Sequence, residues 1–379
     1  MAASQHHEIA DLSCGPGELS FTARIGDIEQ RIWLRTAADA ATSEEAVLPA
    51  CLMPAMRLGG RLTLPIAVSP RVLRNQREFQ SVQKAWSRQW EHDVSPLSEV
   101  DVAASAAVPE ARPEASGRVA AFFSGGIDSW SVLLEHPEIT DLIFIHGFDL
   151  LPDAPRQAEL APRVERSLRD AADALGLRFH VVETNLRRLS DPAVNWEVYC
   201  GCALDAVALF LGPMFERVLI ASDTDHETQV PSGISRLVDH LWSSERLEVV
   251  QAGGRHGRVE RLRRIVDHPI VRRTLRVCWE NHDGAYNCCR CRKCLITMIG
   301  LEALGVRGSF PTFPGDLDLD LLAEAELTQM IQLVMWEDTL DAAQAAGRID
   351  LAAPVARLVG RGKRNLGLPP SYRSRAATG

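Results

Sequence analysis

The 379-residue chain lacks a long apolar segment and an excess of positive charge. Its longest apolar stretches, such as residues 203–212, are too short to span a bilayer. Residues 1–15 contain no apolar core of the kind found in signal peptides. Lys and Arg number 41 against 50 Asp and Glu, and a net charge of −9 excludes a polycation that coats nucleic acid. We therefore expect a cytoplasmic protein, outside the membrane, that is not built to coat nucleic acid.

The nine cysteines are not spread along the chain as in a disulfide-rich secreted protein. Five lie between Cys278 and Cys294, and two more are Cys200 and Cys202. Hydrophobic residues make up 46% of the sequence, which is ordinary for a globular chain long enough to bury its own core. The clustering of the cysteines indicates a metal site in a reducing compartment.

Residues 101–118 are rich in alanine and proline and predict a linker between two units. The first unit, residues 1–100, mixes short alternating strands with helical periodicity, so we expect a small α+β unit. Its expected elements are strands at 21–26, 30–35 and 61–68 and helices at 49–57 and 74–90. This unit offers a surface for a protein partner or for a second copy of the chain.

Residues 119–306 alternate short apolar runs with helical segments. The runs lie at 119–123, 142–146, 179–182, 218–221 and 247–250, and the helices at 130–135, 157–175, 197–211 and 234–242. This alternation predicts an α/β unit with a doubly wound parallel sheet, covered by helices on both faces.

Residues 307–379 predict a helical C-terminal extension. Helical patterns cover 321–336 and 340–346, and a Gly-, Arg- and Pro-rich segment over 359–379 predicts a frayed tail.

The segment Ser124–Ser129 (SGGIDS) joins the first apolar run of this unit to a helix. In a parallel sheet this junction is where ligands bind. Gly125 and Gly126 permit positive φ and close approach of the backbone, and the N–H groups of such a turn favour a phosphate. The spacing is not that of a Walker A loop. The alternative is an ordinary strand-to-helix turn.

Within this segment we expect two residues, Asp128 and Ser129, to take part directly in chemistry. Ser124 and Ser129 add hydroxyl donors, and Ser129 can also cap the helix. Asp128 repels phosphate as a direct ligand, so it is suited to holding Mg²⁺ or orienting the amides of the loop. The remaining residues, Gly125, Gly126 and Ile127, contribute backbone.

Four cysteines have the spacing of a metal site, with Cys278 upstream of a C-x2-C-x2-C run formed by Cys288, Cys291 and Cys294. Four thiolates suit tetrahedral Zn²⁺ in a structural site. A [4Fe–4S] cluster is the alternative, and thiols without metal are a third. We expect Cys289 to point away from the site, although an exchange of roles with Cys288 stays open.

The SGGIDS segment resembles the PP-loop of the ATP pyrophosphatase superfamily, also called adenine nucleotide α-hydrolases. The resemblance implies a HUP-like fold and cleavage of ATP between the α and β phosphates, with the loop holding the leaving pyrophosphate. It further implies that AMP passes to a carboxylate, amide or ring oxygen of the substrate and is then displaced by a nitrogen or sulfur nucleophile.

The loop and the four cysteines together resemble the 7-cyano-7-deazaguanine synthase family over residues 119–304, about half of the chain. That resemblance implies that Ser124, Gly125, Gly126, Asp128 and Ser129 form the pyrophosphate loop and that Cys278, Cys288, Cys291 and Cys294 bind zinc. The chain departs from the family in its additional N- and C-terminal segments, in one extra residue after Cys278 and in Cys289 where glycine is usual. No segment matches the deazapurine pocket, so the substrate does not transfer with the fold.

Other polar residues follow the predicted strands at the same edge of the sheet. We expect His146 near the adenosine, as the superfamily implies, and Asp223 near Mg²⁺ or substrate. The remaining candidates are Asp149, Thr184, Asn185, Arg187, Ser222, Asp225 and His226. For each of them the alternative is a capping or loop residue.

Two further features carry weaker hypotheses. Cys200 and Cys202 lie near a predicted helix start, where a lowered pKa would suit sulfur transfer, and the alternative is simple packing. An arginine-dense stretch suggests an anion site, with a solvated helix face as the alternative. Its members are Arg255, Arg258, Arg261, Arg263, Arg264, Arg272, Arg273 and Arg276.

We therefore expect an ATP- and Mg²⁺-dependent adenylating enzyme that activates a carboxylate or amide for attack by ammonia or an amine. A sulfur transferase that uses Cys200 and Cys202 is the first alternative. A non-catalytic nucleotide-binding or partner-modifying module is the second.

Overall fold

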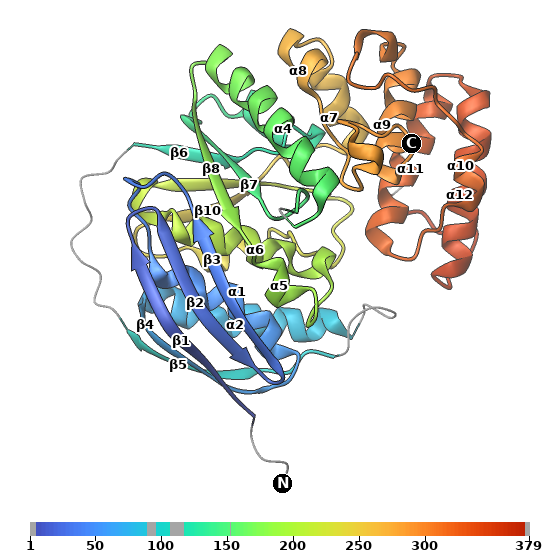
Figure 1. The fold of residues 1–379 in the computed structure, drawn as a ribbon. Coiled ribbons are helices and arrows are strands. Elements are labelled where there is room, and N and C mark those ends of the chain that lie inside the picture. The colour runs from blue at the N-terminus through green and yellow to red at the C-terminus, as the bar shows by residue number, and fades with distance from the viewer. Residues whose placement is uncertain (1–4, 89–95, 107–116, 152, 376–379) are drawn as a thin grey trace.

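The computed structural model describes residues 5–88, 96–106, 117–151 and 153–375. It is a mixed α/β structure with twelve α-helices and one ten-stranded sheet, most of whose neighbouring strands are parallel (Figure 1). No helix in these residues is long and apolar enough to cross a membrane.

The sheet runs in the order β10-β9-β6-β7-β8-β3-β2-β1-β4-β5. Its strands are β1 (His6–Gly15), β2 (Glu18–Ile25), β3 (Ile28–Arg35), β4 (Gly60–Val68), β5 (Val100–Ala106), β6 (Val119–Phe122), β7 (Asp141–His146), β8 (Arg178–Thr184), β9 (Arg217–Ala221) and β10 (Glu248–Ala252). The five strands from β6 to β10 pair only in parallel with one another. Counted along the chain, their order is 3-2-1-4-5, the doubly wound order whose direction reverses between the first and fourth strands.

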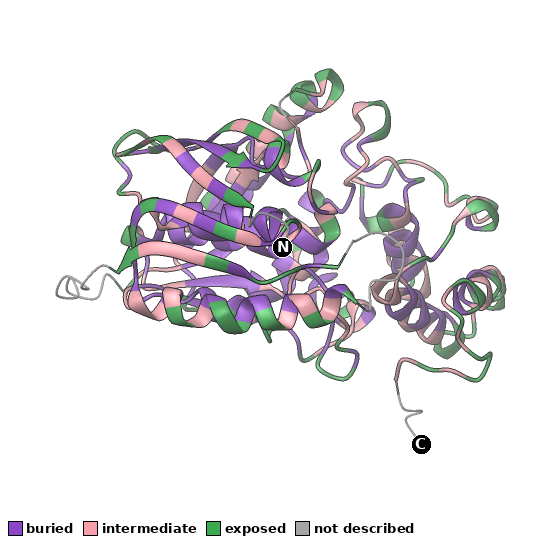
Figure 2. Ribbon diagram, turned by 90° about the horizontal axis from the view of Figure 1, so that it is seen from below, coloured by how far each residue is buried: buried purple, intermediate pink, exposed green. Residues whose placement is uncertain are grey.

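Strand β6 shows why this half of the sheet needs cover on both faces. Ala120 and Phe122 belong to the hydrophobic core on one face, and Ala121 and Phe123 to the core on the other. Successive side chains of a strand point to opposite faces, so a wholly apolar run satisfies two cores at once. The predicted two-sided cover of the parallel sheet is confirmed, and buried residues concentrate in the strands and the helix faces against them (Figure 2).

The helices fall into those that cover the sheet and those of the C-terminal extension. They are α1 (Val47–Met56), α2 (Pro70–Ser87), α3 (Ile127–Glu135), α4 (Pro155–Ala174), α5 (Arg187–Ser190), α6 (Trp196–Phe210), α7 (Arg258–Ile265), α8 (Pro269–Thr274), α9 (Arg292–Ala303), α10 (Leu321–Glu324), α11 (Met330–Ala345) and α12 (Ile349–Asn365). The C-terminal helices have a core of their own with α9, beside the parallel half of the sheet (Figure 1).

The first unit continues the same sheet through antiparallel pairing of β3 with β8. Side chains after β8 hold this seam. Thr184 Oγ1 donates to the carbonyl of Trp33 at 2.8 Å, and the Asn185 side chain accepts from the Trp33 N–H at 2.9 Å and donates to the Arg31 carbonyl at 2.8 Å. Thr184 and Asn185, predicted as site candidates, therefore join the two halves of the sheet.

Three local expectations were wrong. Residues 101–106, expected at the start of the linker, belong to strand β5, and residues 107–116 lie outside the described part of the chain. Residues 234–242 form hydrogen-bonded turns and a 3₁₀ helix at Asp239–Trp242 in place of the expected helix. The helix expected over 321–336 is interrupted between α10 and α11.

The frayed C-terminal tail is also corrected, as far as residue 375. Helix α12 extends to Asn365, and the chain after it is anchored on the buried carboxylate of Glu337. That carboxylate pairs with Lys363 Nζ at 3.0 Å and accepts from the Ser374 N–H and hydroxyl at 2.8 and 2.6 Å. Further on, Arg375 pairs with Asp338 at 2.9 Å and with Asp225. A buried carboxylate needs such partners, and the tail supplies them.

Candidate functional site

The SGGIDS segment forms a tight bend between β6 and α3, beside the point where strand order reverses. Gly125 has φ +76°, and a Cβ there would lie 2.6 Å from Leu168 Cδ2. Gly126 is the extended N-cap of α3, and its carbonyl accepts from the Ser129 hydroxyl at 3.1 Å. Ser129 therefore lies inside the first turn of α3 and does not cap the helix as expected. Only glycine fits the first position, because it tolerates both the positive φ and the close packing.

The bend leaves backbone donors free. Within the described ranges, the N–H groups of Ser124, Gly125, Gly126, Ile127 and Asp128 donate to no protein acceptor. Part of this set is the unpaired first turn that every helix has. The diglycine bend adds donors to that turn, and Ser124 is exposed beside them. The arrangement is chemically suited to an anion.

Asp128 is held by two arginines of α7 rather than left free. Its two oxygens accept from Arg258 Nη1 at 3.1 Å and Arg261 Nη1 at 2.8 Å. Burial alone would raise the pKa of Asp128, but the two guanidinium groups outweigh it and hold the pKa below its ordinary value. Arg261 also donates to the carbonyls of Ser222 and Thr224, both at 2.6 Å, and so ties the loop to the end of β9. The arginine-dense stretch was visible in the sequence, but its pairing with Asp128 was not.

Asp223 follows β9, across the strand-order reversal from the loop. Its Oδ2 accepts from the Ser232 hydroxyl at 2.7 Å, whereas its Oδ1 is buried without a hydrogen-bond partner in the described structure. Burial raises the pKa of Asp223 to about 6, and the negative charge of Asp128 contributes in the same direction. The structure therefore brings Asp128 and Asp223 into one electrostatic environment.

The other strand-end candidates have mainly local partners. His146 Nε2 lies 3.0 Å from a carboxylate oxygen of Glu165 on α4. Arg187 pairs with Asp191 and donates to the carbonyl of Phe148. The Ser222 hydroxyl donates to the Thr224 carbonyl, the carbonyl of Asp149 accepts from Asn281, and Asp225 caps the turn at Glu227 and Thr228. His226 is exposed beside Arg236.

The four predicted cysteine ligands come together. The Sγ atoms of Cys278, Cys288, Cys291 and Cys294 all lie within 4.8 Å of one another and can hold a metal ion such as zinc. Backbone N–H groups of Asn281 and Cys291 donate to the sulfurs of Cys278 and Cys288 at 3.3 and 3.2 Å. Such bonds stabilise thiolates, the form that binds metal.

The four thiols cannot all ionise by themselves. The pKa of Cys288 is far below its ordinary value because the thiols of Cys278, Cys291 and Cys294 surround its sulfur. The pKa values of Cys291 and Cys294 are raised, because their neighbours in the cluster favour the protonated form there. A cation is what would allow four adjacent thiolates to coexist.

Cys289 points away from the cluster, as predicted. It has φ +59°, its side chain is buried against Gly315, and its thiol donates to the Asn287 carbonyl at 3.6 Å. A positive φ explains why glycine would suit this position.

Cys200 and Cys202 do not have the environment that sulfur transfer was expected to need. Both lie within α6 rather than at its first residue, and Cys202 is buried. Burial raises the pKa of each thiol well above its ordinary value, which is the opposite of the lowered pKa that we predicted. The Cys200 thiol donates back to the Glu197 carbonyl of its own helix.

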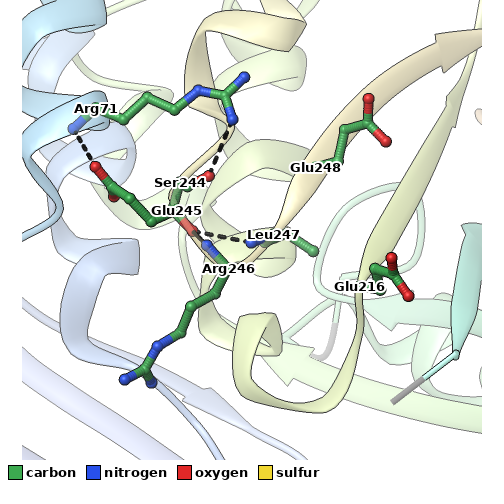
Figure 3. A pocket seen from close by; sticks show the side chains of 7 residues that line it. All are labelled: Arg71, Glu216, Ser244, Glu245, Arg246, Leu247 and Glu248. Carbon is green, nitrogen blue, oxygen red and sulfur yellow. Dashed lines mark hydrogen bonds between the residues drawn. The ribbon is translucent and has the colours of Figure 1, made fainter. Parts of the chain in front are cut away.

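A cavity of about 260 Å³ lies away from this region (Figure 3). It is lined by Arg71 of α2 and by Glu216, Glu245 and Glu248, next to the amino ends of β9 and β10. The SGGIDS segment follows the carboxyl end of β6, at the opposite edge of the parallel sheet. The cavity is therefore separate from the candidate site.

No protein-family model, curated protein or solved structure matches this chain. The assignment of function therefore depends on the residues and contacts described above.

Proposed function

We propose that the chain is an ATP-dependent adenylating enzyme whose SGGIDS loop binds the phosphates of ATP. The observation that carries the proposal is the Gly125–Gly126 bend, which leaves successive backbone N–H groups unpaired beside the strand-order reversal. Ligands of doubly wound sheets bind at that point, and such N–H groups favour phosphate. The resemblance of the loop to PP-loops supports the same assignment.

The proposed reaction is the one that the superfamily resemblance implies. A carboxylate or amide oxygen of a small molecule attacks the α-phosphorus of ATP, the bond to the β-phosphate breaks, and pyrophosphate leaves with its electron pair. Ammonia or an amine then displaces AMP from the activated substrate. The protein's part is positioning together with stabilisation of charge on the phosphates.

The acidic residues divide their roles in this proposal. Both oxygens of Asp128 accept from arginines, so Asp128 orients Arg258 and Arg261 beside the loop. The orphaned Oδ1 of Asp223 fits Mg²⁺, a hard cation that takes oxygen ligands. When bound there, Mg²⁺ would supply positive charge to the phosphates. The Ser129 hydroxyl donates to the Gly126 carbonyl of the loop, and His146 is the last residue of β7, where the superfamily implies adenosine.

For the cysteine site we propose zinc. A tetrahedral ion with Zn–S bonds of about 2.3 Å separates its sulfurs by about 3.8 Å. The Sγ atoms of Cys278 and Cys291 lie 3.9 Å apart, as do those of Cys288 and Cys294. In a [4Fe–4S] cluster each thiolate binds a different iron, so the sulfurs would lie farther apart. Elemental analysis and the absorption spectrum distinguish a colourless zinc protein from a brown iron–sulfur protein.

We do not propose sulfur transfer, because the thiols of Cys200 and Cys202 have raised pKa values and Cys202 is buried. A reactive cysteine needs an accessible thiolate. Replacing both cysteines with serine is expected to leave pyrophosphate formation unchanged. If the double variant formed no product while the wild type did, the sulfur-transfer hypothesis would be restored.

The proposal is tested by pyrophosphate release from Mg-ATP with a panel of small carboxylic acids and amides, with and without ammonia. We expect release with at least one acid or amide, and a loss of about tenfold or more in Asp128→Asn because the arginines lose their anchor. Asp316→Asn, an exposed carboxylate outside the site, is the matched control. ATP binding without pyrophosphate release under every condition would indicate the non-catalytic module, and absence of ATP binding would contradict the loop assignment.

A further inference from the structure

Three cationic side chains are buried in the described structure, and one of them has no counter-charge. Arg261, Lys363 and Arg276 are 1%, 7% and 3% exposed. Arg261 pairs with Asp128 at 2.8 Å and Lys363 with Glu337 at 3.0 Å. Among the described residues, Arg276 forms no ion pair, and its side-chain contact is the neutral amide oxygen of Asn281 at 2.5 Å from Nη2. Burying a charge without a counter-charge costs several kcal/mol of folding free energy. A bound anion beside Arg276 would offset this cost.

The guanidinium of Arg276 also has unused donors. Its Nε is buried and donates to no acceptor in the described residues. A guanidinium carries five N–H donors in a planar fork, a shape that matches phosphate and carboxylate oxygens.

Arg276 lies directly against the diglycine bend. Its backbone N–H donates to the Gly125 carbonyl at 2.9 Å, and its own carbonyl lies 3.6 Å from where a Cβ on Gly126 would stand. Asn281, its side-chain partner, donates to the Asp149 carbonyl at 3.0 Å in the segment after β7. The backbone of Arg276 therefore adjoins the loop, and its side chain is linked through Asn281 to the segment after β7.

We propose that Arg276 is a ligand for a phosphoryl oxygen of the nucleotide held at the SGGIDS loop. The loop amides and the buried guanidinium then form one anion site, in which both sets of unpaired donors donate to oxygens of the same phosphate. Arginine and phosphate form short, charge-assisted and often bidentate hydrogen bonds. The inference rests on the proposed function and adds to it a specific residue outside the loop.

A competing role for Arg276 is charge balance for the cysteine cluster, since Cys278 is two residues away. A divalent metal with four thiolates carries net negative charge. However, the Cys278 sulfur accepts from the Asn281 N–H, and no hydrogen bond joins Arg276 to any of the four sulfurs in the described structure. The test below measures this role directly through the metal content.

The experiment measures binding of pyrophosphate by titration calorimetry to the full chain and to three variants, with zinc content determined on each sample. Arg276→Met removes the charge at similar length, and Arg276→Lys keeps the charge but not the fork. Arg273→Met, an exposed arginine of α8 in the same stretch, is the matched control. We expect affinity to fall roughly tenfold or more in Arg276→Met and by a smaller factor in Arg276→Lys, with Arg273→Met and all zinc contents unchanged.

The other possible results contradict either the assignment of Arg276 or the assignment of the loop. Equal affinity of the wild type and Arg276→Met overturns the assignment of Arg276 and leaves the loop proposal standing. Absence of pyrophosphate binding in the wild type overturns the loop proposal itself. Loss of zinc in the Arg276 variants assigns the residue to the metal cluster instead. If Arg276→Met does not fold, unchanged affinity in Arg276→Lys overturns the proposal by itself.

Discussion

The two halves of the sheet bury their strands differently. In β3 and β4, buried and exposed residues alternate, so one face packs on the core with α1 and α2 and the other meets solvent. In β6, both sets of side chains are buried, because helices cover both faces. When helices cover both faces of a sheet, a ligand can reach it only at the ends of the strands. The SGGIDS loop, Asp223 and the arginines that pair with Asp128 lie at these ends. The N-terminal half uses polar side chains for a different purpose, which is to hold the seam between β3 and β8.

The largest effect is expected at the proposed zinc site. Cys291→Ser removes a ligand from a closed site, and structural zinc contributes roughly 10–16 kcal/mol of apparent affinity in small modules. We expect loss of metal and a large fall in soluble, folded protein. Metal analysis and thermal unfolding measure both. Cys289→Ser, one residue from a ligand but outside the cluster, is expected to retain the metal. A folded, active Cys291→Ser protein would remove the structural role.

Replacing a glycine with alanine is expected to have different effects in the SGGIDS loop and in the N-terminal half of the sheet. Gly125→Ala places a Cβ 2.6 Å from Leu168 at φ +76°, so we expect destabilisation of about 1–3 kcal/mol and loss of pyrophosphate binding. Gly15→Ala in β1 meets nothing within 4 Å and is expected to leave stability within about 0.5 kcal/mol of the wild type. Denaturant unfolding and calorimetry measure the two effects. Similar outcomes for both glycines would show that the bend is not constrained.

Asp223, in the parallel half, is expected to make the stability of the fold depend on pH. Its pKa is raised to about 6 in the folded chain from an ordinary 3.8, so the fold favours the protonated form. Stability should therefore rise as pH falls from above 6 towards 4, by at most about 3 kcal/mol from this group. Asp223→Asn should remove that part of the pH dependence and raise the melting temperature at pH 7. The measurement is a series of melts in magnesium-free buffer. An Asn variant less stable than the wild type at pH 7 would contradict the raised pKa.

The smallest effect is expected at the seam between the halves. Asn185→Ala leaves the Trp33 N–H and the Arg31 carbonyl without their partner, which costs about 1–2 kcal/mol. We expect faster hydrogen exchange of β3 amides and unchanged pyrophosphate binding. Arg188→Ala, nearby on α5, is the control because its ion pair with Asp153 is exposed to solvent. Loss of pyrophosphate binding in Asn185→Ala would return Asn185 to the functional site.

Much of the parallel half was predictable because its signals are local. Apolar runs that alternate with helices predicted β6, β7, β8 and β9 near their observed bounds, and the C-x2-C-x2-C spacing predicted the four thiols that lie together. The diglycine after a strand predicted the positive φ found at Gly125. Each of these features depends on neighbours within about twenty residues.

Other features could not be read locally. The strand expected near residue 30 was correct, but its pairing with β8 connects Leu34 with Thr184. The pKa values of Cys200 and Cys202 depend on burial by distant segments, so a position near a helix start predicted the wrong direction. The tail was expected to fray because it is rich in glycine, arginine and proline, yet Ser374 donates to the buried carboxylate of Glu337.

The sequence alone determined where the backbone bends at Gly125 and which four thiols are spaced to meet, because backbone sterics and short spacings act locally. Tertiary structure decided which charges face one another: Asp128 with Arg258 and Arg261, Arg375 with Asp225, and Arg276 with no carboxylate in the described residues. Electrostatic energy depends on separation and burial in space, and neither is encoded by distance along the chain.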